Sequence, residues 1–201
     1  MKVVIDQLNH HGSGDMAASQ LDLDTETSAN LTFIMDQTNF MNNVPLRLDA
    51  VLGMDLEKGK YTFKENKATI NQLELEFDGF AELLEEGQNI DIKFKTPTSS
   101  FKNFLGLIPE VYSGALDGVK TSGEFSVAGF AKGMLTETTI PKFNIELLSK
   151  NGSFQYPDLP KAVQNIVIDT KIVNETGLMK DIFVYIKQLS FKIDQDVFNA
   201  K

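Results

Sequence analysis

The stretch LELEFDGFAELLEEGQNIDIKFK, residues 73–95, decides the fold of this chain because apolar and polar residues alternate on both sides of a turn. A period of two places apolar side chains on one face of a β-strand and polar side chains on the other. Glu86-Gly87 stands where a two-residue hairpin loop needs a residue that tolerates positive φ. The apolar positions that share one face are Leu73, Leu75, Phe77, Ala81, Leu83, Ile90, Ile92 and Phe94.

A turn at Glu86-Gly87 also predicts the register of this hairpin. In that register every apolar residue of the two strands falls on the same face, whereas a slip of one residue would turn one strand over. We therefore expect a hairpin with one apolar face and one polar face. The expected partners are Leu83 with Ile90, Ala81 with Ile92, and Gly79 with Phe94.

The same alternation recurs along most of the chain and predicts a mainly antiparallel β-protein. Further strands are expected within residues 2–8, 21–24, 31–36, 40–56, 61–63, 119–127, 143–147, 166–172 and 184–193. Residues 10–15 are expected to form a loop, and Glu65-Asn66 and Asn151-Gly152 to form turns. One domain, residues 1–201, accounts for the whole length.

Two short segments break the strand pattern and predict one or two short helices. Ser99 and Ser100 are N-cap residues for a helix over 101–108 that ends at Pro109. Its apolar stripe favours a helix that covers one end of the sheet over a helix that contacts a membrane, because such stripes are usually core. A turn at residues 157–160 is expected to start a second brief helix that ends at Val163.

Composition and motifs exclude several functional classes. The net charge of −9 argues against a nucleic-acid partner, and the absence of cysteine excludes disulfides and thiolate chemistry. His10, His11 and Asp15 match no metal-site spacing, and the acidic residues of 73–95 (Glu74, Glu76, Glu82, Glu85 and Glu86) are typical of a solvated sheet face. We therefore predict a protein that is not an enzyme and needs no cofactor and no metal.

The apolar face of the strands leaves two architectures open. A closed β-sandwich would cover that face with a second sheet. A single sheet curled into a trough would cover part of the face and leave the rest for an apolar ligand. Periodicity does not distinguish the two.

From residue 66 onward the chain resembles the C-terminal region of the AsmA-like family of bacterial envelope proteins, in versions from Bacteroidetes-type bacteria. The shared features are a strand–glycine–strand opening, an F-x-x-F-L-x-L-I-P helix, and P-x-F-x-I-x-L followed by N-G-x-F-x-Y-P-x-L-P. The segments that carry the resemblance are residues 68–80, 89–112, 123–135, 140–166 and 186–198.

The resemblance implies a long twisted antiparallel sheet curled into an open groove that carries phospholipid across the periplasm. It implies an inner-membrane anchor at an N-terminal region that this sequence lacks, so that the chain is a fragment of a longer protein. The expected function is lipid binding or transfer in support of outer-membrane assembly; the alternative is an envelope sandwich without lipid, and envelope protein partners are not predicted. From strand parity, the expected groove lining is Leu73, Leu75, Phe77, Ile90, Ile92, Phe94, Phe125, Val127, Phe143, Ile145 and Leu147.

Overall fold

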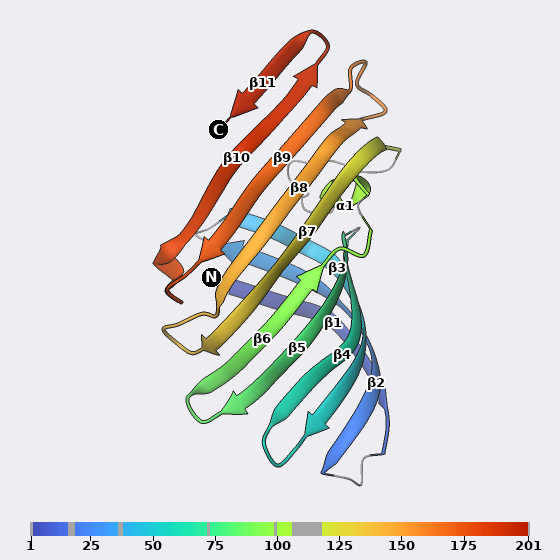
Figure 1. The fold of residues 1–201 in the computed structure, drawn as a ribbon. Coiled ribbons are helices and arrows are strands. Elements are labelled where there is room, and N and C mark those ends of the chain that lie inside the picture. Colours follow the sequence, from blue (N-terminus) through green and yellow to red (C-terminus); the bar gives the residue numbers. More distant parts are fainter. Residues whose placement is uncertain are drawn as a thin grey trace.

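A single antiparallel sheet contains all the strands of the computed structural model, which describes residues 2–15, 19–35, 38–71, 73–98, 100–105 and 118–200. Its eleven strands lie side by side in chain order (Figure 1). Most neighbours are joined by a hairpin or a short connection, whereas β6 and β7 are joined by residues 96–119, which include a short helix. The strands are β1 Lys2–Ser13, β2 Gln20–Met35, β3 Thr38–Asp55, β4 Lys60–Ile70, β5 Leu73–Leu84, β6 Gly87–Lys95, β7 Lys120–Leu135, β8 Lys142–Gln155, β9 Val163–Asn174, β10 Ile182–Ile193 and β11 Asp196–Ala200. The prediction of a mainly antiparallel β-protein is confirmed.

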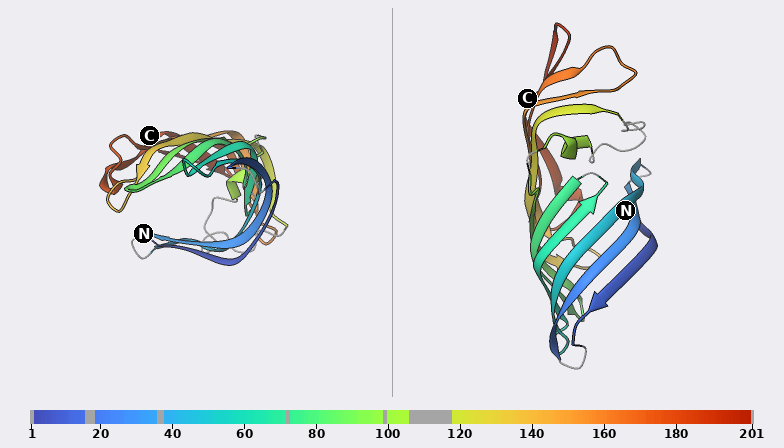
Figure 2. Two further views of the ribbon diagram at one scale, coloured as in Figure 1. Left: turned by 90° about the horizontal axis from the view of Figure 1, so that it is seen from below. Right: turned by 90° about the vertical axis from the view of Figure 1, so that its right-hand side faces the viewer.

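The sheet is curled into an open trough rather than stacked on a second sheet. Viewed from below, its strands follow a C-shaped curve, and the short helix α1, Lys102–Leu105, lies inside that curve (Figure 2). A 3-10 turn, η1, Met179–Asp181, precedes β10. Because all described strands belong to one sheet, a closed sandwich has no second sheet among these residues.

Irregular pairing gives the sheet much of its bend. The ladder between β1 and β2 shifts between Asp6 and Asn9, where Gln7 has a φ of 53°. Similar shifts interrupt β4 between Phe63 and Asn66, and β10 between Ile186 and Gln188. Extra residues of this kind bend a strand and increase its local twist, which favours a coiled sheet over a flat one.

The predicted register of the opening hairpin is wrong by two residues. The loop is Glu85-Glu86, not Glu86-Gly87, and Leu84 pairs with Gly87. Gly87 instead opens β6 with a φ of 146°, where a Cβ atom would lie 2.3 Å from the carbonyl oxygen of Leu135. Because the shift is two residues, the apolar face is unchanged. The observed partners are Leu83 with Gln88, Ala81 with Ile90, Gly79 with Ile92, and Phe77 with Phe94.

Four local predictions are corrected by the strand ladders. The expected loop at 10–15 is mostly strand, because β1 continues to Ser13 and pairs with β2. Glu65-Asn66 lies within β4, at the shift in its pairing with β5, and Asn151-Gly152 lies within β8, so neither is a hairpin turn. Residues 157–162 form turns and bends without a helix, with Leu159 N donating to Tyr156 O at 3.2 Å.

The helix predicted over 101–108 is present in its described part. The structure has a helix at Lys102–Leu105 that follows the buried Phe101. Ile108 and Pro109 lie outside the described residues. Phe101 therefore becomes the residue through which this segment meets the sheet.

Replacing Gly87 tests the close approach of β6 to the end of β7. We expect Gly87→Ala to lower the free energy of unfolding by about 1–3 kcal/mol more than Gly133→Ala, measured by urea denaturation. Gly133 has a similar φ of 127°, but its nearest neighbours to a Cβ atom are 3.8 Å away. The Gly133→Ala control therefore introduces the same backbone strain without a steric clash of the new Cβ atom. Equal losses in the two variants would contradict the expected steric role.

Candidate functional site

A continuous row of paired residues crosses nine strands of the sheet, from β2 to β10, and defines one face. Each member lies directly opposite the next in the strand ladders, so all their side chains point to the same side. We call this set the central row. Its members are Thr25, Ala50, Asn66, Phe77, Phe94, Gly129, Ile145, Ile172 and Val184.

The face that carries the central row is the inside of the trough. Phe101, next to α1, packs edge-on against Phe125 with ring centroids 6.3 Å apart. Phe125 and Leu73 belong to a buried apolar cluster together with Phe101, Val127, Ile166 and Ile168. Since α1 lies inside the curve of the sheet (Figure 2), this apolar face is the inner face.

All eleven residues predicted from strand parity to line a groove lie on the inner face. Leu73, Phe125 and Val127 are buried, because they lie in the cluster that Phe101 joins. The remaining eight are only half-buried. They are Leu75, Phe77, Ile90, Ile92, Phe94, Phe143, Ile145 and Leu147. The predicted lining residues are therefore covered near Phe101 and remain partly exposed outside that cluster.

Phe101 is seated by an irregularity in the neighbouring strands. A Cβ atom on Gly152 would lie 2.2 Å from Cε2 of Phe101, so only glycine leaves room for the ring. The backbone N of Phe101 donates to the carbonyl oxygen of Gly123 at 3.1 Å, and the pairing of β7 with β8 shifts beside Gly123. Sequence reasoning assigned Asn151-Gly152 to a turn and missed this role. The signal available was a glycine within an otherwise strand-like segment.

Polar side chains on the inner face are engaged mainly with the backbone. Thr25 Oγ1 donates to Ala50 O at 3.0 Å, and Ser149 Oγ donates to Ile166 O at 3.2 Å. Asn66 donates through Nδ2 to Phe77 O at 3.3 Å, whereas its buried Oδ1 has no hydrogen-bond partner in the part of the chain that the structure describes. Most of these groups are satisfied locally, so they add little polarity to the trough.

A large concave feature follows the central row. A hollow of about 1280 Å³ runs across β1–β8 and is lined by six members of the central row, namely Thr25, Ala50, Asn66, Phe77, Phe94 and Gly129, and by two rows of residues that flank them. One row is His11, Glu26, Asp49, Lys67, Glu76, Lys95, Ala128 and Glu146; the other includes Ser13, Asp24, Val51, Lys64, Asp78, Lys93, Phe130 and Asn144. Of the predicted lining residues, only Phe77 and Phe94 border this hollow.

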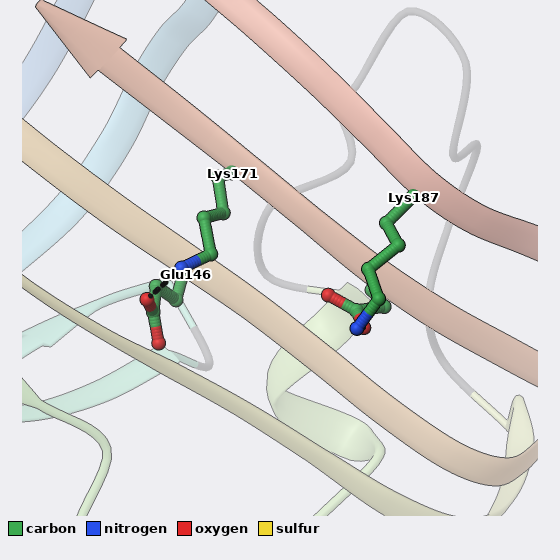
Figure 3. A network of polar contacts seen from close by, with 4 residues as sticks. Glu146, Lys171 and Lys187 are labelled. Carbon is green, nitrogen blue, oxygen red and sulfur yellow. Dashed lines mark hydrogen bonds and ion pairs between the residues drawn. The ribbon is translucent and has the colours of Figure 1, made fainter. Parts of the chain in front are cut away.

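Ion pairs organise the outer face into charge ladders. Lys171 Nζ lies 2.6 Å from Glu146 Oε1, and Lys187 Nζ lies 2.8 Å from Asp169 Oδ2. These pairs stand on the side of the strands away from α1 (Figure 3). The hydrogen bond from Lys187 to Asp169, assisted by the charge of that carboxylate, raises the pKa of Lys187. Exposed pairs of this kind keep the outer face hydrated and add little stability.

The acidic residues and histidines weighed as catalytic or metal-binding groups do not form one site. Glu76 borders the hollow across β1–β8, whereas Glu85 and Glu86 form the hairpin loop. His10 bonds Thr27 at 2.9 Å, whereas His11 borders the same hollow. Within the described residues, no group of three or more His, Cys, Asp or Glu side chains could hold a metal ion.

Comparisons with known proteins identify no relative: no protein family, curated protein or solved structure matches this chain. The resemblance to the AsmA-like family therefore stays a prediction from the sequence. Among the described residues, no helix has the length and apolar character needed to cross a membrane.

Truncating Phe101 tests how much the packing of its ring inside the trough stabilises the fold. We expect Phe101→Ala to lower the free energy of unfolding by about 3–5 kcal/mol, because it removes a fully buried aromatic side chain. Phe130→Ala is the control, since Phe130 is 40% exposed on the outer face, and it should cost less than about 1 kcal/mol. Urea denaturation gives both values. Similar losses would show that Phe101 contributes no special packing.

Proposed function

We propose that this protein is a non-enzymatic lipid-binding groove whose inner face holds phospholipid acyl chains. The observation that carries the proposal is the half-buried state of eight apolar inner-face residues, which no second sheet of the described residues covers. Acyl chains would supply the missing cover, while their headgroups stay in water. Each buried methylene contributes about 0.8 kcal/mol, so a chain of ordinary length would be held firmly without any polar anchor.

A trough without specific polar anchors also suits movement of the ligand. Hydrophobic burial has no preferred direction and depends mainly on area, so a chain can shift along an apolar face with little change in free energy. Most inner-face polar groups are already bonded to backbone, as for Thr25 and Ser149. Transfer of lipid, as well as its binding, is therefore part of the proposal.

The cellular setting of the proposal is inferred from the AsmA-like resemblance alone. It comprises a periplasmic location, an inner-membrane anchor in a longer protein, and support of outer-membrane assembly. The charged outer face is compatible with an aqueous compartment, since it pairs Lys95 with Glu76 and Lys132 with Asp91.

The alternative function is a structural or interaction module of the envelope that binds no lipid. The packing of Phe101 against Phe125 favours it, because that part of the inner face is already covered by the protein itself. The two functions differ in whether lipid contacts the eight half-buried residues of the inner face.

Photo-crosslinking distinguishes the two functions. p-Benzoylphenylalanine in place of Phe94, on the inner face, should form covalent phospholipid adducts after irradiation of protein exported to the periplasm of a Gram-negative bacterium. The same replacement at Phe130, on the outer face, is the matched control and should form few. Mass spectrometry of the purified protein counts the adducts, and native mass spectrometry of the unmodified protein should detect retained lipid.

An absence of lipid in both measurements, with a folded protein by circular dichroism, would overturn the lipid-binding proposal. Equal adduct formation at the two positions would contradict the assignment of the inner face.

A further inference from the structure

The first half of β10 is an open edge of the sheet. β11 pairs only with Leu189–Ile193, so no described strand pairs with the outer edge of residues 182–188. Four consecutive apolar side chains lie on this stretch, and Phe183, Val184, Tyr185 and Ile186 are 53%, 59%, 57% and 42% exposed. A free strand edge with apolar residues on both faces is a template for pairing with another chain.

The sequence of this edge is chemically symmetric. Reading outward from Val184, residues 181–187 are Asp-Ile-Phe-Val-Tyr-Ile-Lys. The positions equidistant from Val184 are an aromatic pair, an aliphatic pair and a pair of opposite charges. Such a segment is complementary to an antiparallel copy of itself, because antiparallel strands place equidistant positions opposite each other.

We propose that two copies of this protein pair antiparallel along residues 181–187, about a two-fold axis at Val184. Phe183 would then lie opposite Tyr185 of the second copy on the outer face. Ile182 would lie opposite Ile186 of the second copy on the inner face, with the two Val184 side chains at the axis. At each end, Asp181 would lie opposite Lys187 of the second copy. This proposal is independent of the proposed lipid binding.

The charges at the two ends of residues 181–187 favour a second copy of this protein, in this register, as the partner of the free β10 edge. The two opposite-charge pairs at the ends of the segment are satisfied at once only when Val184 faces Val184. The unpaired part of β10 is also long enough for residues 181–187 to pair with a second copy, because η1 ends at Asp181 and β11 ends opposite Leu189. A two-fold contact of this kind is self-complementary and closed, whereas pairing of β10 with the other edge strand, β1, would continue indefinitely from copy to copy.

The arrangement of the side chains already suits this contact. The rings of Phe183 and Tyr185 lie on the same face with centroids 6.4 Å apart, so each can meet its counterpart across the axis. Asp181 accepts a hydrogen bond from Thr176 Oγ1 at 2.7 Å, and Lys187 pairs with Asp169. Both charged side chains are thus held near the strand, with Asp181 half-buried and Lys187 exposed.

Disulfide trapping tests the axis directly, since the chain has no cysteine of its own. Directly opposite residues of an antiparallel pair have Cα atoms about 4.5–5.5 Å apart, within the range of a disulfide. Val184→Cys should therefore form a covalent dimer rapidly under mild oxidation. Ile5→Cys, on the β1 edge and 55% exposed, is the matched control and should remain monomeric.

Mixing the two cysteine variants separates the alternatives. A mixed dimer of V184C with I5C, formed as fast as the V184C dimer, would show pairing between β10 and β1 and overturn the two-fold proposal. Equal rates of self-crosslinking for the two variants would show random collision and overturn it as well.

Sedimentation velocity of the cysteine-free protein gives an independent measurement. We expect a concentration-dependent dimer of twice the 22.4 kDa chain. Val184→Lys, which places two cations at the axis, should abolish that dimer, whereas Ile5→Lys should preserve it. Circular dichroism verifies that both variants fold. A protein that stays monomeric at all concentrations, or a dimer that survives V184K, would overturn the proposal.

Discussion

The structure depends on one constraint: apolar residues must stay on the same face of a single sheet through every strand. The central row meets this constraint from Thr25 in β2 to Val184 in β10. A slip of one residue in any hairpin would turn the following strands over and expose their apolar side chains. Short connections between most neighbouring strands keep the alternation in phase, and β6 and β7 share the same apolar face although residues 96–119 separate them in the sequence. The register of each hairpin is thus fixed by the need to share one apolar face.

Curvature is the second consequence of having one sheet. A flat single sheet would expose its whole apolar face, so the trough brings inner-face side chains toward one another. Irregular pairing at Gln7, and between β7 and β8, supplies part of this bend. The second irregularity also seats Phe101 over Gly152, so a single local feature both bends the sheet and fills it. Elsewhere on the inner face Leu21, Leu23, Ala29 and Ala50 are also buried, whereas most of the predicted lining residues are only half-buried.

The sequence was sufficient to predict strand parity but not exact pairing. In residues 84–87, Leu-Glu-Glu-Gly, the loops Glu85-Glu86 and Glu86-Gly87 give registers that differ by two residues, and both keep the apolar face intact. Parity therefore could not select between them. Asn151-Gly152 was misread because a bulge and a tight turn both favour residues with positive φ, and Asn151 has a φ of 51°.

Features that depend on which strands are neighbours could not be predicted from the sequence alone. The hollow across β1–β8 exists because central-row residues and their neighbours from eight strands come into line, which no segment reveals by itself. The open edge of β10 exists because β11 stops opposite Leu189. The sequence predicted a strand within residues 184–193, but it contains no information on whether another strand lies beside it.

The inner face and the open edge meet at Val184, which is both the last member of the central row and the residue at the proposed two-fold axis. Antiparallel pairing about an axis perpendicular to the sheet keeps the same face on the same side. Each inner face would therefore continue into the other copy without a change of polarity, with Ile182 and Ile186 on either side of the axis. A trough built from one sheet can be lengthened only at its edges, so association at β10 extends the apolar surface, whereas stacking of two sheets would close it.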